Sequence, residues 1–110
     1  MSPPRLPQIT HLQFLVLGRL LNDEQPGRVI RDAIAEFGVR RSGPAFYQMM
    51  SRLERAKLVE GWYEQVVVVG DQAVTERRYR IRPAGARVWR ETSEFYRKAA
   101  PLAAQRWSDA

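Results

Sequence analysis

The chain has 110 residues, 45% of them hydrophobic, which is enough apolar material for one ordinary domain with a single core. It contains no cysteine, and this excludes disulfide scaffolds and thiolate metal sites. The sequence shows neither a signal peptide nor a run of about 18 uninterrupted apolar residues, so the expected location is the cytoplasm.

The net charge of +6 is unevenly distributed along the chain. Residues 40–57 carry a net charge of +4 and residues 76–98 one of +5, whereas residues 1–39 are neutral and residues 58–75 carry −3. A basic excess suits nucleic acid, an anionic membrane or simply a well-solvated surface. The two basic blocks are therefore the candidate contact regions.

The N-terminal third is expected to contain a short arm and two helices. Residues 1–9 include three prolines and predict a disordered arm. Thr10 and Gln13 form a capping box, and the helix that starts there is expected to end near Leu21, buried on most sides. After a turn-rich linker over residues 22–27, apolar residues at i, i+3, i+4 and i+7 predict the inward stripe of a second helix: Ile30, Ala33, Ile34 and Phe37.

A sharp turn and a third helix are predicted next. Gly38 fits the left-handed residue that ends a helix, with Val39 folding back on the last turn. Ser42 is a good N-cap and Pro44 is tolerated in a first turn, which predicts a helix over residues 43–56. Its inward stripe is expected to be Phe46, Met49, Met50 and Leu53; the opposite face carries Pro44, Gln48, Ser51 and Arg55, flanked by Tyr47 and Arg52.

The rest of the chain predicts a β-hairpin and a last helix. Residues 58–69 and 74–81 have strand-like composition around a turn at 70–72, and Tyr79 and Ile81 alternate with Arg78 and Arg80, so that one face can pack while the other offers cations. At least two of the valines Val66–Val69 must face away from the core; a partner subunit or a hairpin folded over its own domain would cover them. The last helix opens at Pro83, and Pro101 is expected to break or kink it.

This order of elements predicts an α+β fold that is mainly α, a winged helix-turn-helix with a C-terminal dimerisation helix. The expected division is a disordered arm over residues 1–9, a DNA-binding domain over residues 10–82, and a dimerisation helix with its tail over residues 83–110.

The outer face of the third helix is the candidate reader of DNA, because a major groove about 12 Å wide admits one helix. Gln48 can pair with adenine and Arg55 with guanine, while arginines near the helix N-terminus and on the wing stem suit phosphates. The wing tip lacks Arg and Lys and is not expected to grip phosphate. A solvated helix face with ordinary capping is the alternative interpretation. The predicted DNA-binding residues are Arg40, Arg41, Ser42, Pro44, Tyr47, Gln48, Ser51, Arg52, Arg55, Arg77, Arg78 and Arg80.

The last helix carries an apolar stripe that is wider than packing on one side requires. A two-fold partner would bury it, and a dimer could match two DNA half-sites about one helical turn apart. Docking of the helix on its own domain is the alternative. The predicted interface residues are Val88, Trp89, Thr92, Phe95, Tyr96 and Ala99.

Catalysis and metal binding are not expected. The single histidine, His11, lies in the first turn of the first helix, and no spaced cluster of His, Asp or Glu resembles a metal set. No nucleophile has an evident base, and no Gly-rich phosphate loop is present. We therefore expect neither an enzyme nor a cofactor.

The runs Tyr47–Val59 and Arg77–Gly85 resemble two motifs of one family, the PadR-like transcriptional regulators, in particular their short members. The run Tyr-Gln-Met-Met-Ser-Arg-Leu-Glu-Arg-Ala-Lys-Leu-Val at residues 47–59 is similar to the family pattern of Tyr, then Arg-Leu-Glu, then Gly-Leu-Val, with Lys57 in place of the usual Gly. Residues 77–85 resemble its Arg-x-Tyr-x-Leu-Thr-x-x-Gly segment, with Arg82 in place of Thr. The resemblance covers about residues 12–99. It implies a dimeric winged-helix repressor whose Tyr47 approaches DNA, with Trp89 and Tyr96 at a cavity between subunits for flat hydrophobic compounds.

The expected function is thus sequence-specific binding of double-stranded DNA by a homodimeric transcriptional repressor that responds to a small hydrophobic ligand. The alternative is a winged-helix module that binds another protein and not DNA.

Overall fold

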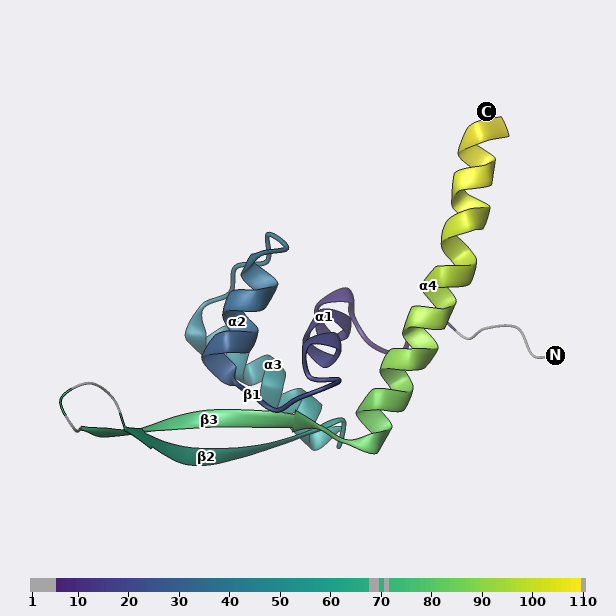
Figure 1. Cartoon of the computed structure of the whole chain (residues 1–110). Coiled ribbons are helices and arrows are strands. Elements are labelled where there is room, and N and C mark those ends of the chain that lie inside the picture. Colours follow the sequence, from purple (N-terminus) through teal and green to yellow (C-terminus); the bar gives the residue numbers. More distant parts are fainter. Residues whose placement is uncertain (1–5, 68–69, 71, 110) are drawn as a thin grey trace.

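The computed structural model describes residues 6–67, 70 and 72–109, without the side chains of residues 67 and 102–109. In chain order the elements are α1 (His11–Arg19), β1 (Gln25–Pro26), α2 (Gly27–Ala35), α3 (Gly43–Arg55), β2 (Val59–Val67), β3 (Ala73–Ile81) and α4 (Pro83–Asp109) (Figure 1). The strands form an antiparallel sheet of order β1-β3-β2. The predicted fold class, a mainly α winged helix with a β-hairpin, is confirmed.

Local side-chain caps explain where two of the helices begin. The Thr10 hydroxyl accepts a hydrogen bond from the Gln13 backbone N–H at 3.1 Å, and the Gln13 side chain accepts one from the Thr10 N–H at 3.0 Å. The Ser42 hydroxyl accepts one from the Ala45 N–H at 3.2 Å. Each cap satisfies backbone donors that lack helical partners, so both predicted helix starts are confirmed.

The end of α2 differs from the prediction at one residue. The Val39 N–H donates to the Ile34 carbonyl at 3.2 Å and the Gly38 N–H to the Ala35 carbonyl at 2.9 Å, with Gly38 at φ +81°. These bonds define a left-handed helix end of the Schellman type, as predicted. Because the helix already ends at Ala35, Phe37 leaves the inward stripe, and its side chain is 71% exposed. The expectation that Phe37 packs inward was wrong.

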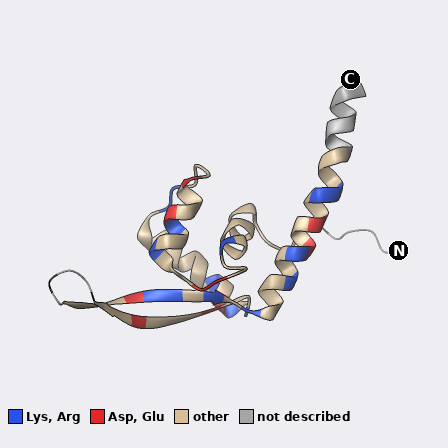
Figure 2. Cartoon of the chain, viewed as in Figure 1, with Lys and Arg blue, Asp and Glu red and all other residues tan. Residues whose placement is uncertain are grey.

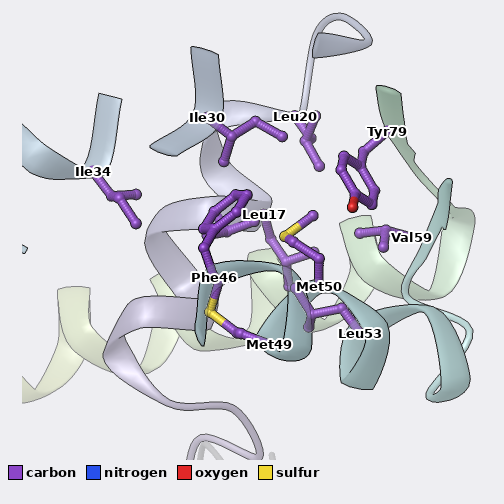
Figure 3. Packing of buried hydrophobic residues seen from close by; sticks show 11 residues of the cluster. Leu17, Leu20, Ile30, Ile34, Phe46, Met49, Met50, Leu53, Val59 and Tyr79 are labelled. Carbon is purple, nitrogen blue, oxygen red and sulfur yellow. The ribbon is translucent and has the colours of Figure 1, made fainter. Parts of the chain in front are cut away.

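The hydrophobic core lies between the first three helices and the base of the hairpin (Figure 3). All four residues of the predicted inward stripe of α3 are buried in it, and Ile9 packs against its edge although it belongs to the predicted arm. The buried cluster comprises Val16, Leu17, Leu20, Ile30, Ile34, Phe46, Met49, Met50, Leu53, Val59 and Tyr79. This core fixes α3 so that its opposite face is exposed.

The sheet contains one strand that the sequence did not predict. Gln25 and Pro26, expected in a linker, pair with Tyr79 and Arg78 of β3. A strand of two residues is too short to show an alternating pattern, which explains the miss. The hairpin of β2 and β3 projects beyond the helices instead of folding back over them (Figure 1). Of the four valines, Val66 is half-buried opposite Val74, whereas Val68, Val69 and the Val67 side chain lie outside the described residues.

Helix α4 is a single helix of 27 residues, about 40 Å long at 1.5 Å per residue. It continues through Pro101, so the helix does not break there. Proline has no N–H to donate to the carbonyl of Arg97. Its first half packs beside α1, and the rest projects away from the body (Figure 1). Gly85 is buried at its start, where a Cβ would collide with the Leu58 carbonyl. This close approach is a structural reason for glycine at that position of the second motif.

Candidate nucleic-acid interface

The outer face of α3 is exposed along its length. Gln48, Ser51 and Arg55 point away from the core, as expected, and Pro44 and Arg52 are exposed as well. This arrangement follows from the helical period, because the residues three and four apart that face the core are all buried. The face therefore presents an amide, a hydroxyl and guanidinium groups that could contact base edges in a DNA groove.

Tyr47 lies at the edge of this face and is 38% exposed. Its ring stands at 81° to that of Phe46, with the ring centroids 5.1 Å apart. A Cβ at Gly27 would lie 2.9 Å from the Tyr47 hydroxyl, so only glycine at the start of α2 leaves room for it. Tyr47 is thus anchored on the protein side with its other edge accessible.

Three arginines surround the N-terminus of α3. Arg40 and Arg41 are exposed, as expected, and precede the Ser42 cap. Arg31 of α2 lies beside them, because its Nε donates to the Arg41 carbonyl at 2.8 Å. Its Nη1 is also close to Gly43, at 3.7 Å from the place that a Cβ on this residue would take. Sequence reasoning missed Arg31, because nothing in its local pattern on α2 shows that it reaches the next helix. Guanidinium groups and free N–H groups at a helix N-terminus favour an anion.

The wing arginines, in contrast, are paired with carboxylates. Figure 2 shows basic segments in blue and acidic segments in red along the same hairpin. The ion pairs are Arg77 with Glu54 at 2.5 Å, Arg78 with Glu64, Glu76 and Glu24 at 3.1, 3.2 and 3.5 Å, and Arg80 with Glu60 at 2.7 Å. The Arg78 side chain is only 18% exposed. Arg78 and Arg80 lie on one face of β3 and Arg77 lies on the other. The expected face of free cations is therefore not present in the single chain, because both Arg78 and Arg80 pair with carboxylates, as Arg77 does on the other face.

Burial and the neighbouring charges shift two pKa values at the base of the wing. Burial disfavours the charged form of Arg77, but the Tyr79 hydroxyl and the Glu54 carboxylate outweigh it, so the pKa of Arg77 is raised above its ordinary value. Burial raises the pKa of Tyr79 to about 12, although Arg77 acts in the opposite direction. Both groups therefore keep their protons at neutral pH.

A cleft of about 520 Å³ lies between α3 and the wing. Tyr47 and Ser51 line it from α3, and Tyr63 and Thr75 line it from the two strands. Its charged residues cancel, since Arg77 pairs with Glu54 and Arg28 pairs with Glu76 at 3.3 Å. The cleft therefore presents mainly hydroxyl groups and aromatic rings.

Several predicted interface residues of α4 contact the same chain. The Trp89 and Phe14 rings stack with centroids 5.4 Å apart, and the Tyr96 hydroxyl lies 2.8 Å from Nδ1 of His11. Thr92 is 2% exposed and donates its hydroxyl to the Val88 carbonyl. The alternative of docking on its own domain therefore accounts for Trp89, Thr92 and Tyr96. The other predicted interface residues are half-buried in the single chain: Val88, Phe95 and Ala99.

An apolar groove of about 290 Å³ lies beside the Trp89 ring. Phe14, Ala33, Ile34 and the exposed Phe37 also line it. Of the two proposed ligand-contacting residues, the groove therefore contains Trp89, whereas Tyr96 faces His11.

Neither a metal centre nor a membrane span emerges from the described part of the chain. Among its residues, His, Asp and Glu form no group of three that could hold a metal ion. None of its helices combines the length and the apolar character needed to cross a membrane.

Comparison with known proteins finds matches among solved structures only; no family model and no curated protein matches. A PadR family transcription regulator from Clostridium difficile R20291 superposes with a TM-score of 0.74 at 16% identity, covering 87% of this chain and 97% of that chain. A PadR family regulator from Eggerthella lenta DSM 2243 gives 0.67 at 23% identity, covering 86% and 79%. Bacillus subtilis PadR in complex with operator DNA gives 0.59 at 16% identity, covering 74% and 46%.

The helices, the hairpin and the exposed third helix define a winged-helix protein. More particularly, the chain has the fold of the PadR-family transcriptional regulators, as the resemblance of its two motifs implied.

Proposed function

We propose that this chain is a non-catalytic transcriptional regulator of the PadR type that binds double-stranded DNA as a homodimer and acts as a repressor. The observation that carries the proposal is the exposed face of α3 next to a cluster of three arginines at its N-terminus. The operator-bound PadR structure supports it, because its fold is similar. Residues 10–82 would form the DNA-binding domain and residues 83–110 the dimerisation segment. The protein would act in the cytoplasm.

In this proposal α3 enters the major groove. Gln48, Ser51 and Arg55 would meet base edges and so determine sequence preference. Arg40 and Arg41 would bind phosphates and fix the position of the helix without selecting a sequence. Arg77, Arg78 and Arg80 are not assigned to phosphates, because carboxylates of the same chain already balance them.

The proposed dimer would use α4. The outer part of this helix projects from the body, and Phe95 and Ala99 are still partly accessible in the single chain. The apolar groove beside Trp89 and Phe37 is a separate apolar surface of the single chain. A flat hydrophobic effector would fit the same apolar chemistry, and binding there could alter the spacing of the two α3 helices.

The decisive experiment is selection of bound fragments from the genome of the host, followed by a salt titration on the strongest fragment. Electrostatic binding predicts that affinity falls linearly on a log–log plot with salt. The double variant Arg41→Ala with Arg55→Ala should lose most of the selective binding. Arg87→Ala is the matched control, because Arg87 is exposed in the first half of α4, outside the surface proposed for the dimer. Binding that ignores salt, or survives the double variant, would overturn the proposal.

The second candidate is a protein-interaction module, and the balanced charge of the wing is the observation that favours it. This candidate predicts a stable complex with another protein and no retention on DNA resin. Retention of the purified chain on genomic fragments, displaced by salt, would exclude it.

A further inference from the structure

One ion pair joins α3 to strand β3 of the wing, and it passes over Gly61 of strand β2. Arg77 of β3 donates from Nη2 to Oε1 of Glu54 on α3, and both side chains are 23% exposed. The guanidinium carbon of Arg77 also lies 4.7 Å from the centre of the Tyr63 ring and 5.7 Å from that of Tyr79. Arg77 is therefore in contact with Glu54, Tyr63 and Tyr79 at once. Its positive charge is paired with the Glu54 carboxylate and is not free to bind a DNA phosphate.

The strand between these two residues is adapted to the pair. Gly61 of β2 lies opposite Tyr79, and a Cβ there would collide with the Glu54 carboxylate and lie 2.9 Å from Nη2 of Arg77. Any residue other than glycine would push the two partners apart. The room for the ion pair thus depends on a particular residue in a third element.

The pair of Glu54 and Arg77 lies where the hairpin leaves the core, so it can affect the direction in which the outer hairpin points. The core reaches only as far as Val59 and Tyr79 at the base of the wing. Beyond them, β3 is joined to the body by the pairing of β1 with Tyr79 and Arg78 and by three ion pairs. These ion pairs are Arg77 with Glu54 of α3 at 2.5 Å, Arg28 of α2 with Glu76 at 3.3 Å, and Arg78 with Glu24 at 3.5 Å. The Arg28 side chain is 71% exposed, so solvent screens this second ion pair more strongly. The pair of Glu54 and Arg77 is the shortest of the three ion pairs, and it is the one that joins the hairpin to α3.

We infer that Glu54 and Arg77 are positioning residues: their ion pair holds the wing at the distance from α3 that lets one sugar–phosphate strand of DNA enter the cleft lined by hydroxyl groups. The inference rests on the proposed function for the identity of the ligand. Its mechanical part, the fixed direction of the wing, does not depend on DNA.

The first test measures the wing without DNA. The chain has no cysteine, so Glu36→Cys on the body and Val74→Cys on the wing can carry two spin labels at exposed positions. Labelled protein is mixed with excess unlabelled protein, and electron–electron distances are recorded for the parent, Glu54→Ala, Arg77→Ala, Gly61→Ala and the exchange Glu54→Arg with Arg77→Glu. We expect a narrow distribution in the parent, broad ones in the three single variants, and a narrower one again in the exchange.

Glu60→Ala is the matched control, since Glu60 pairs with Arg80 at 2.7 Å entirely within the hairpin. Its distance distribution should equal that of the parent. Equal distributions in all variants, with circular dichroism showing that they are folded, would overturn the inference.

The second test measures affinity for the genomic fragment that the unsubstituted protein selects most strongly. Removing a carboxylate near DNA should strengthen binding if only charge matters, and Glu60→Ala should do so slightly. We expect Glu54→Ala to weaken binding instead, on the order of tenfold, the size of coupling through one close pair. Arg77→Ala should weaken DNA binding by the same factor, and the double variant Glu54→Ala with Arg77→Ala should weaken it no further. The salt slope should be unchanged in all three variants.

Two results would contradict this outcome. If Arg77→Ala flattens the salt slope by about one while Glu54→Ala tightens binding, Arg77 is a phosphate ligand and not a positioning residue. If the variants lose only thermal stability and bind normally, the pair serves folding alone. Failure of the parent protein to bind any fragment would refute the proposed function, and the distance measurements would then decide the inference by themselves.

Discussion

At the scale of single residues, α2 and α3 end in the same hydrogen-bonding motif with different residues at its left-handed position. Gly38 occupies it after α2 at φ +81°, and Lys57 occupies it after α3 at φ +61°. The Lys57 N–H donates to the Glu54 carbonyl at 2.9 Å and the Leu58 N–H to the Leu53 carbonyl at 3.0 Å. A side chain in this conformation costs about 1–2 kcal/mol. The turn is therefore preserved despite the departure from the family pattern, at the expense of backbone strain.

We predict that Lys57→Gly raises the free energy of unfolding by about 0.5–1 kcal/mol, since glycine adopts the left-handed region without that cost but loses more conformational entropy on folding. Urea unfolding would measure the change. Lys57→Ala is the control, because it removes the charge and keeps the strained conformation. A gain for alanine as large as that for glycine would show that charge, not backbone conformation, is responsible.

Tyr79 predicts how stability depends on alkaline pH. Burial raises its pKa to about 12 from an ordinary value of 10.0, so between these values the unfolded chain ionises while the folded chain keeps the proton. The stabilising contribution is complete below about pH 10 and is lost as pH rises through 12. We expect the free energy of unfolding to fall over this interval, and to fall less in Tyr79→Phe. Urea unfolding at steps from about pH 9 upward would detect it; parallel curves for both proteins would refute the assignment.

At the scale of elements, the predictable parts were those with local signals. The Ser42 cap and the buried stripe predicted α3 and its outer face, because both depend on residues within a few positions of one another. β1, Arg31 and the carboxylate partners of Arg78 were missed, since each depends on segments that meet only in the folded chain. The three partners of Arg78, for example, come from positions 24, 64 and 76.

The division of charge between α3 and the wing predicts two kinds of arginine. Replacing Arg40 and Arg41 by glutamine should weaken DNA binding and reduce the magnitude of the salt slope by about 2, since each phosphate contact contributes about 0.9. Arg78→Gln should leave the slope unchanged and destabilise the fold, because the Glu76 carboxylate, which is only 13% exposed, loses one of its two arginine partners. Salt titrations of each variant on one genomic fragment, beside thermal unfolding, separate these effects. A smaller slope for Arg78→Gln would place that arginine on the DNA.

At the scale of the whole molecule, α4 and the wing extend from opposite sides of a small helical body, and the chain measures 62 × 28 × 22 Å (Figure 1). An elongated shape of this kind leaves several described residues of α4 exposed, among them Arg90, Arg97 and Lys98. The intramolecular contacts of Trp89 and Tyr96 occupy the side of α4 that faces α1. A dimer would therefore use a narrower surface than the aromatic stripe in the sequence predicted, around Phe95 and Ala99.

We predict that this surface makes the melting temperature depend on protein concentration, because association stabilises the folded chain by mass action. Phe95→Glu should abolish that dependence and give a monomer in sedimentation experiments, since a carboxylate would be buried without a partner. Arg90→Glu is the control, as Arg90 is exposed on the same helix. If the unsubstituted chain sediments as a monomer at all concentrations tested, one assembly could not bind both half-sites of an operator. The proposed homodimer would then be refuted, whereas the proposal that α3 binds a single DNA site would stand.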